Sequence, residues 1–243
     1  VPATEKVSMN ILAINTSLST GSVAAMSYSK NEEQIVEKPL GEARGHARRL
    51  VNTLTSVAND AGFHVRDADI IAVIKGPGSF TGLRVGVTTA KALCWASKAT
   101  LIGISGFDVV ARRTSKICSG HTTINIAFDA GRDEVYATEA CADQDVGAGW
   151  HMTDGKLLSR QHWLESLPPG RCISGPAIEL CGVEARALGL TVAPSEVWHP
   201  NASEAAILGS ILNTMKISDA PSDLLPEYSR PSYAEEKHPR SSE

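Results

Sequence analysis

The chain has 243 residues, of which 42% are hydrophobic and 21% are charged, and its formal net charge is −4 at pH 7. This composition is that of an ordinary globular protein, and no run reaches the roughly 18 apolar residues of a membrane-spanning helix. A mildly acidic chain is a poor autonomous ligand for nucleic acid, because such binding depends on neutralising phosphates. We therefore expect a cytoplasmic protein in which any RNA contact is carried mainly by another molecule.

Neither the cysteines nor the first residues indicate export. The five cysteines are odd in number and contain no C-x-x-C pair, so we expect free reduced thiols rather than a disulfide framework or a zinc knuckle. Residues 1–8 lack the basic start and apolar core of a secretory signal. Because Met9 begins the first strand-like run, we expect residues 1–8 to be an extension, an expression remnant or a flexible leader.

The first half of the chain alternates strand-like and helix-like patterns. Apolar runs predict strands at 9–15, 22–28, 34–37, 69–74 and 100–104. Apolar residues at helical spacing, ended by Gly62, predict a helix over 47–61. Two further helices are predicted at 80–97 and 107–113.

The second half repeats this order more loosely. Strands are predicted at 122–128, 134–140, around 154–155, at 171–174 and at 191–193, and helices at 177–188 and 201–215. Asn201 followed by Glu204 resembles a capping box for the last helix. Strands that feed helices through short connections predict an α/β fold of layers, and the repeated order favours two lobes. We expect an extension at 1–8, lobes at 9–115 and 116–200, a helix at 201–217 that packs on the lobes, and an irregular tail at 218–243.

The most unusual segment is a glycine-rich turn between the strand at 69–74 and the helix at 80–97. Its candidate functional residues are Gly76, Gly78, Ser79, Thr81 and Gly82. Such a turn can hold an anion on free helix N–H groups, but the Walker A, dinucleotide and nucleophile-elbow spacings are all missing. The residues alone favour a tight turn with a helix cap.

The helix at 80–97 is apolar around most of its circumference. Arg84 and Lys91 are its only charged residues before Ser97, and Leu83, Val87, Ala90 and Cys94 form one apolar stripe. Further apolar residues, including Trp95, lie on other sides. A helix of this kind is normally buried on several sides. The pattern leaves open whether its own lobe or a partner covers the second side.

Five segments of the chain resemble the TsaB (YeaZ) family. They are K-G-P-G-S-F-T-G-L-R-V-G-V-T-T-A-K-A-L at 75–93, M-N-I-L-A-I-N-T-S at 9–17, G-H-A-R-R-L-V at 45–51, D-A-G-R-D-E-V-Y at 129–136 and L-P-E-Y-S-R at 225–230. The resemblance implies an actin-like ATPase (ribonuclease H-like) fold with two lobes, the second reduced. It also implies tRNA processing: a subunit that acts with a TsaD-like catalytic subunit and the ATPase TsaE in forming N6-threonylcarbamoyladenosine beside the tRNA anticodon.

Family members pair through their first two helices, which correspond here to 44–61 and 80–97. The resemblance therefore implies a partner interface made by Arg44, His46, Leu50, Leu54, Leu83, Arg84, Val87, Ala90, Lys91 and Cys94. It leaves open whether the chain also forms a homodimer. We expect no cofactor of its own, with ATP or ADP bound only in the assembled complex, and tRNA reached through that complex.

The sequence indicates that another subunit carries out the catalysis. TsaD binds metal through a His-x-x-x-His pair, whereas residues 105–112 contain no histidine. Asn15 stands where actin-like ATPases usually carry the aspartate that holds magnesium, and an amide lacks the charge that attracts a hard cation. We expect no catalytic or metal-binding residues, and an accessory subunit rather than an enzyme. The alternative is a stand-alone ATP-dependent hydrolase or kinase, which would use Gly76–Gly82 for phosphate and Asp129 as a carboxylate.

Overall fold

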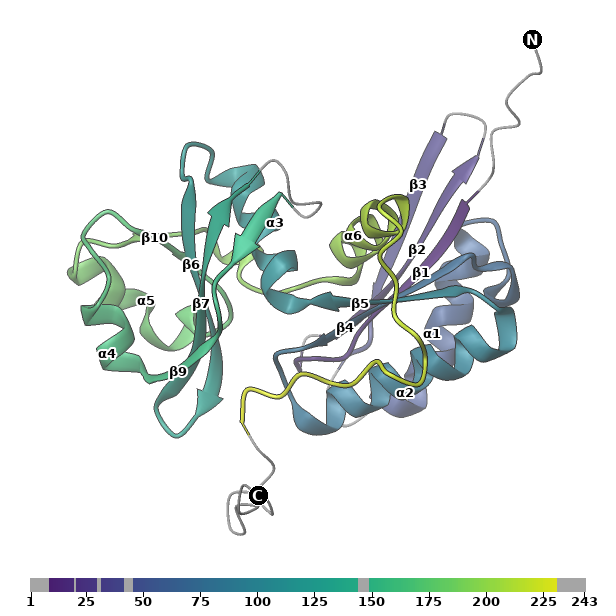
Figure 1. Cartoon of the computed structure of the whole chain (residues 1–243), viewed down its shortest axis with the longest axis horizontal. Coiled ribbons are helices and arrows are strands. Elements are labelled where there is room, and N and C mark those ends of the chain that lie inside the picture. The colour runs from purple at the N-terminus through teal and green to yellow at the C-terminus, as the bar shows by residue number, and fades with distance from the viewer. Residues whose placement is uncertain (1–8, 20, 30–31, 42–45, 144–148, 231–243) are drawn as a thin grey trace.

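The computed structural model describes residues 9–19, 21–29, 32–41, 46–143 and 149–230, and two β-sheets divide these residues into two lobes (Figure 1). The predicted leader at 1–8 and the tail beyond 230 lie outside the described residues. Within the described parts, no helix combines the length and the apolar character that crossing a bilayer requires.

The first lobe is a five-stranded sheet in the order β3-β2-β1-β4-β5. Its strands are β1 (Met9–Asn15), β2 (Ser22–Ser29), β3 (Glu32–Pro39), β4 (Ile70–Gly76) and β5 (Thr100–Ser105). The first three pair in an antiparallel way, and β4 and β5 extend the sheet in parallel with β1. Helices α1 (His46–Asp60) and α2 (Phe80–Ser97) cover one face, and α6 (Ala202–Thr214) covers the other.

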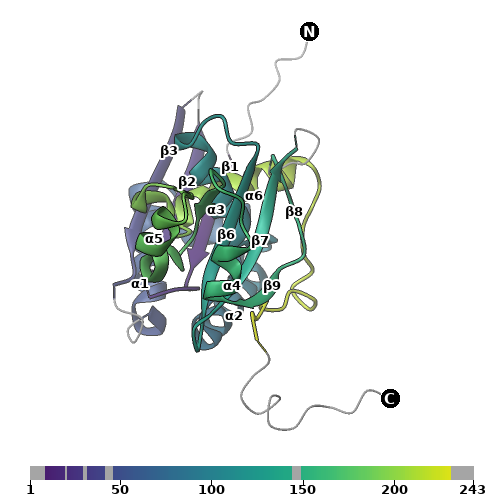
Figure 2. The same ribbon diagram turned by 90° about the vertical axis from the view of Figure 1, so that its left-hand side faces the viewer.

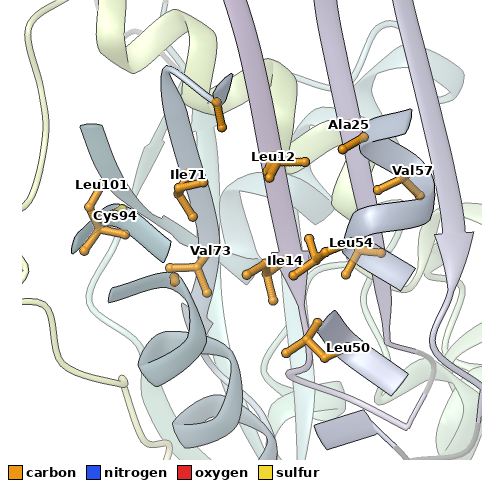
Figure 3. Close-up of a cluster of buried hydrophobic side chains, with 14 of the residues drawn as sticks. Leu12, Ile14, Ala25, Leu50, Leu54, Val57, Ile71, Val73, Cys94 and Leu101 are labelled. Atoms are coloured by element: carbon orange, nitrogen blue, oxygen red, sulfur yellow. The ribbon is translucent and has the colours of Figure 1, made fainter. Parts of the chain in front are cut away.

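Strand β1 shows why this lobe is stable. Ile11 to Ile14 have no exposed surface, because helices cover both faces of the strand and successive side chains point to opposite faces. Leu12 and Ile14 pack toward Leu50 and Leu54 of α1 (Figure 3), whereas Ile11 and Ala13 belong to the cluster that contains α6.

The second lobe repeats the strand order of the first. Its elements are β6 (Thr123–Gly131), β7 (Glu134–Ala142), β8 (Trp150–Met152), β9 (Lys156–Ser159), α4 (Arg160–Glu165), β10 (Cys172–Ser174), α5 (Ile178–Ala187) and β11 (Thr191–Val192). The hairpin β6–β7 is antiparallel, and β10 and β11 continue in parallel with β6, as β4 and β5 do with β1. Figures 1 and 2 show α4 and α5 on the outer side of this sheet. The shared order confirms the two-lobe α/β prediction.

Helix α3 (Gly106–Ile117) lies between the lobes (Figure 1). Its Val109 belongs to a buried cluster of the first lobe, whereas Phe107, Val110 and Ala111 pack against β6 of the second. Two short 3-10 helices, Val65–Asp67 and Ser195–Val197, complete the described elements. The chain passes between the lobes through α3 and again through the segment that joins β11 to α6.

Several local predictions differ in detail from the structure. Helix α4 was not predicted, because its six residues are too few to show helical spacing. The strand pair expected around 154–155 consists of β8 and β9, each of which pairs with β7. The capping box at Asn201 is half formed: its side chain accepts the N–H of Glu204. The Glu204 carboxylate instead binds Arg112 and Lys116 of α3.

Candidate functional site

The glycine-rich turn from Gly76 to Gly82 packs directly on the loop that follows β1. The N–H of Ser79 donates to the carbonyl of Ser17 at 2.7 Å. The hydroxyl of Thr16 donates to the carbonyl of Gly82 at 2.7 Å. Ser79 is also the N-cap of α2, because its hydroxyl accepts the N–H of Gly82. The predicted tight turn with a helix cap is therefore confirmed.

Close packing explains why these positions are glycine. A Cβ added at Gly78 would lie 2.2 Å from the Ser17 carbonyl oxygen, and one at Gly82 would lie 2.1 Å from that of Thr16. A Cβ at Gly76 would lie 2.2 Å from the carbonyl oxygen of Glu227. Such separations are well inside van der Waals contact, so backbone would have to move. At each of these glycines the close approach is therefore made by the chain's own backbone.

We expect Gly82→Ala to destabilise the protein by more than about 2 kcal/mol, because its new methyl group meets backbone rather than a flexible side chain. The measurement is urea unfolding followed by circular dichroism. Thr81→Ala, one position earlier on the exposed side of the same turn, is the control and should change stability by less than about 0.5 kcal/mol. Equal stability of the two variants would contradict the packing argument.

Asn15 is fully buried at the end of β1, and its amide group satisfies three hydrogen bonds. Its Nδ2 donates to the carbonyl of Pro200 at 2.7 Å. Its Oδ1 accepts the N–H of Ser17 at 3.1 Å and the hydroxyl of Ser17 at 2.7 Å. An ionised aspartate could accept from Ser17 but could not donate to Pro200. Here the amide ties the first loop to the segment that leads into α6.

Asn15→Asp should therefore lower stability by about 2–3 kcal/mol at pH 7–8, because a buried carboxylate would face the Pro200 carbonyl. Burial raises the pKa of such a carboxyl, and its protonated form can donate, so the loss should shrink as the pH falls. Thermal unfolding across pH 4–8 tests this, with the exposed Asn52→Asp as the control. A pH-independent loss would show that the donor role of the amide is unimportant.

A cluster of charged groups surrounds the start of α3. Burial raises the pKa of Asp108, in the first turn of this helix, to about 6; Lys75 opposes the shift and Glu227 adds to it. Lys75, near the end of β4, forms an ion pair with Glu227 at 2.7 Å. From the second lobe comes Tyr136, whose pKa is raised by burial and by nearby Glu227 and Asp154. The two lobes and the C-terminal segment thus meet at one group of charges.

The pKa of Asp108 gives a signed prediction. Its value in the fold, about 6, lies above the ordinary 3.8, so the fold binds the proton more tightly than the unfolded chain does. The contribution of Asp108 to the free energy of unfolding is therefore greatest below about pH 4, where the carboxyl is protonated in both states. This contribution is lost as the pH rises through about 6. Asp108→Asn should raise stability at pH 7.5 by about 1–3 kcal/mol and flatten the slope between these limits.

Urea unfolding at several pH values measures this effect. Asp223→Asn is the matched control, because Asp223 is exposed. An Asp108→Asn protein that keeps the wild-type slope would contradict the assignment.

Six residues of the predicted partner interface are buried. Leu50, Leu54, Leu83, Val87, Ala90 and Cys94 are 0–4% exposed and form part of the core of the first lobe. Their own lobe covers these side chains, so in this structure they leave almost no surface free for a partner. Arg44 lies outside the described residues, and the side chain of His46 is not described.

The other two predicted interface residues reach the surface of α2. Arg84 is exposed; its guanidinium lies 3.8 Å from the centre of the Phe80 ring, and its Nε donates to the hydroxyl of Tyr228 at 2.9 Å. Lys91 is half-buried and lines a groove of about 600 Å³ together with Thr88, Ala92, Trp95, Pro221 and Ser222. We define the outer face of α2 as Arg84, Thr88, Lys91, Ala92 and Trp95.

Trp95 is the largest apolar group on this outer face and is 88% exposed. The predicted interface omitted it, although its place off the main apolar stripe is visible in the sequence. Covering a tryptophan removes roughly 200 Å² from water, which gives about 5 kcal/mol before the costs of association. Val51 of α1, 60% exposed, adds apolar surface on the neighbouring helix. These side chains make the outer surface of the first lobe chemically suited to docking.

No group of three or more His, Cys, Asp or Glu side chains in the described parts of the chain is arranged to hold a metal ion.

Comparisons with known proteins agree with this architecture. Residues 21–153 match the family described as TsaD, tRNA N6-adenosine threonylcarbamoyltransferase. The TsaB proteins of Bacillus subtilis and Escherichia coli are 34% and 30% identical over 128 and 143 residues, which cover 53% and 59% both of this chain and of each relative. The chain thus matches only a little over half the length of these relatives.

A solved structure described as YeaZ from Pseudomonas aeruginosa superimposes with a TM-score of 0.70 at 20% identity and covers 90% of this chain and 99% of its own. A second Pseudomonas aeruginosa structure, described as similar to peptidase YEAZ, gives 0.72 at 21% identity and covers 91% and 100%. At these identities the likeness concerns the fold.

The two lobes, each a hairpin extended by parallel strands, define a protein with the actin-like ATPase fold, and more than half of the chain matches the TsaD family. The chain therefore belongs to the family described as TsaD, tRNA N6-adenosine threonylcarbamoyltransferase. Within it, the sequence identities to TsaB proteins support the TsaB (YeaZ) branch, and the YeaZ structures share its fold.

Proposed function

We propose that this chain is a non-catalytic partner subunit in the formation of N6-threonylcarbamoyladenosine next to the tRNA anticodon. It docks a TsaD-like catalytic subunit on the outer face of α2 and the adjoining part of α1. The observation that carries the proposal is the 88% exposure of Trp95 beside a groove of about 600 Å³. Exposed tryptophans next to pockets are typical of the residues that dominate binding energy.

Three features support a non-catalytic role. Residues 105–112 contain no histidine, so the metal-binding pair of TsaD has no counterpart in this sequence. The side chain of Asn15 is engaged by Pro200 and Ser17. The glycines at 78 and 82 lie against the backbone of the first loop. In this proposal a TsaE-like ATPase, any ATP or ADP, and the tRNA join through the assembled complex in the cytoplasm.

The docking proposal predicts that Trp95→Glu weakens binding of a TsaD protein by about 100-fold or more, because a charge would be buried unpaired at the interface. Isothermal titration calorimetry measures the affinity. Val183→Glu is the control: Val183 is 78% exposed on α5 of the other lobe, so its variant should bind normally. Both variants should keep the wild-type melting temperature. Substituting the buried Val87 or Ala90 would instead disrupt the lobe itself.

Reconstituted tRNA threonylcarbamoylation with and without the chain tests the wider role. We expect modification to require the chain and to fail with Trp95→Glu but not with Val183→Glu. The alternative, a stand-alone ATP-dependent hydrolase or kinase, requires the isolated chain to bind and turn over ATP with magnesium. Turnover by the isolated chain, or unchanged binding by Trp95→Glu, would overturn the proposal. Analytical ultracentrifugation of the chain alone shows whether the same face pairs two copies when the partner is missing.

A further inference from the structure

The C-terminal segment from Asp219 to Arg230 has no regular secondary structure, yet it is held along its length. At its start, the N–H of Asp219 donates to the carbonyl of Leu101 at 2.9 Å. The carboxylate of Asp219 accepts the N–H of Gly103 at 2.8 Å. Leu224 is 3% exposed and belongs to the core of the first lobe. A Cβ at Gly103 would lie 2.5 Å from Leu224, so β5 is shaped to receive this segment.

The middle of the segment follows the end of β4 and the start of α2 (Figure 1). The N–H of Glu227 donates to the carbonyl of Lys75 at 2.7 Å, and the two side chains form an ion pair. The ring of Tyr228 lies 4.6 Å from that of Phe80, and its hydroxyl accepts from Arg84. Both the backbone and the side chains of the segment therefore bind to the first lobe, and these contacts fix its path.

The end of the segment reaches the second lobe. Arg230 forms an ion pair with Glu134, and its guanidinium donates to the carbonyl of Gly131 at 3.2 Å. Both acceptors belong to the β6–β7 hairpin, whose two-residue turn is Arg132–Asp133. Both turn residues have positive φ, 55° and 63°, a conformation that is unfavourable for residues other than glycine. Arg230 on one side and Arg160, which pairs with Asp133 at 2.5 Å, on the other hold this turn in place.

We propose that residues 219–230 form a strap that fixes the angle between the two lobes, with Arg230 as its clasp on the β6–β7 hairpin. Apart from the strap, the described chain passes between the lobes only at α3 and at the segment from β11 to α6, and these passages lie close together (Figure 1). Two neighbouring connections leave the lobes able to rotate about the line that joins them. The strap crosses on the side of β9, away from that line, and so opposes the rotation (Figure 1).

Only the clasp is separate from the proposed docking face: Arg230 and Glu134 lie outside the outer face of α2, whereas Pro221 and Ser222 of the strap line the groove beside Trp95. Arg84 belongs to that face and bonds to Tyr228, two residues from Arg230. The clasp therefore concerns how the lobes are held in the isolated chain, whatever binds to α2.

Pulsed electron–electron double resonance on the full chain tests the strap by measuring the distance between one spin label on each lobe. The labels are attached to non-canonical residues at the exposed positions 55 of α1 and 184 of α5. We expect a single narrow distance distribution for the wild type and a roughly twofold or greater broadening for Arg230→Met. Glu134→Gln keeps shape and hydrogen-bonding capacity but loses the charge, so it should broaden the distribution less. Arg66→Met removes an exposed arginine of the first lobe and is the matched control, with no expected change.

Hydrogen exchange gives a second readout. Loss of the clasp should accelerate exchange of the amides at 131–134 by about tenfold or more, with no change in β1. Folded Arg230→Met with the wild-type distance distribution and exchange rates would overturn the proposal. If Arg230→Met does not fold, Glu134→Gln decides in the same way: broadening relative to Arg66→Met supports the strap, and an unchanged distribution refutes it.

Discussion

The contact between the loop after β1 and the glycine-rich turn before α2 determines the position of much else in this chain. The N–H of Ser79 donates there to the carbonyl of Ser17, and the side-chain hydroxyl of Thr16 donates to the carbonyl of Gly82. Only glycine allows this approach, since any Cβ at positions 78 or 82 would overlap a carbonyl oxygen. The contact sets where α2 begins and therefore which of its sides faces the sheet. It also aligns the first loop so that Asn15 can reach Pro200 at the entry to α6.

From this arrangement α2 acquires two different surfaces. Its inner side fills the core with Leu83, Val87 and Ala90, whereas its outer face presents Trp95. The N-terminal turn of α2, next to the glycine-rich turn, also contacts Tyr228: the Phe80 ring packs against its ring, and Arg84 donates to its hydroxyl. One helix thus supports the core, the surface that we propose for docking, and the segment that reaches the second lobe. The charge cluster of Lys75, Asp108 and Glu227 lies where these parts meet.

Much of the fold could be predicted from the sequence, because it depends on local patterns. Apolar runs located β1 and β4, and Gly62 marked the end of the first helix through backbone geometry. The resemblance to TsaB supplied the two-lobe fold that the structural comparisons support. The candidate site was predicted less well. A helix that is apolar on every side does not reveal which side its own sheet covers, so the stripe predicted for a partner is instead the one that its own lobe buries.

The remaining features depend on contacts between distant residues, which no local pattern encodes. The tail after residue 218 is rich in proline and charge and was expected to be irregular, yet Leu224 is a core residue and Arg230 binds a hairpin 96 residues away. The sequence alone shows that Asn15 stands where actin-like ATPases usually carry an aspartate. Its physical meaning, a donor to Pro200, required the partner 185 residues further along the chain.

The exposure of Trp95 also has an optical consequence. Of the four tryptophans, Trp163 and Trp150 are 2% and 8% exposed, and Trp198 is half-buried, whereas Trp95 is surrounded almost entirely by water. Its indole therefore contributes a red-shifted emission that iodide can quench by collision, while the sheltered rings emit from a less polar environment. The chain carries a built-in fluorophore whose spectrum reports, without any label, whether the outer side of α2 is wet or covered.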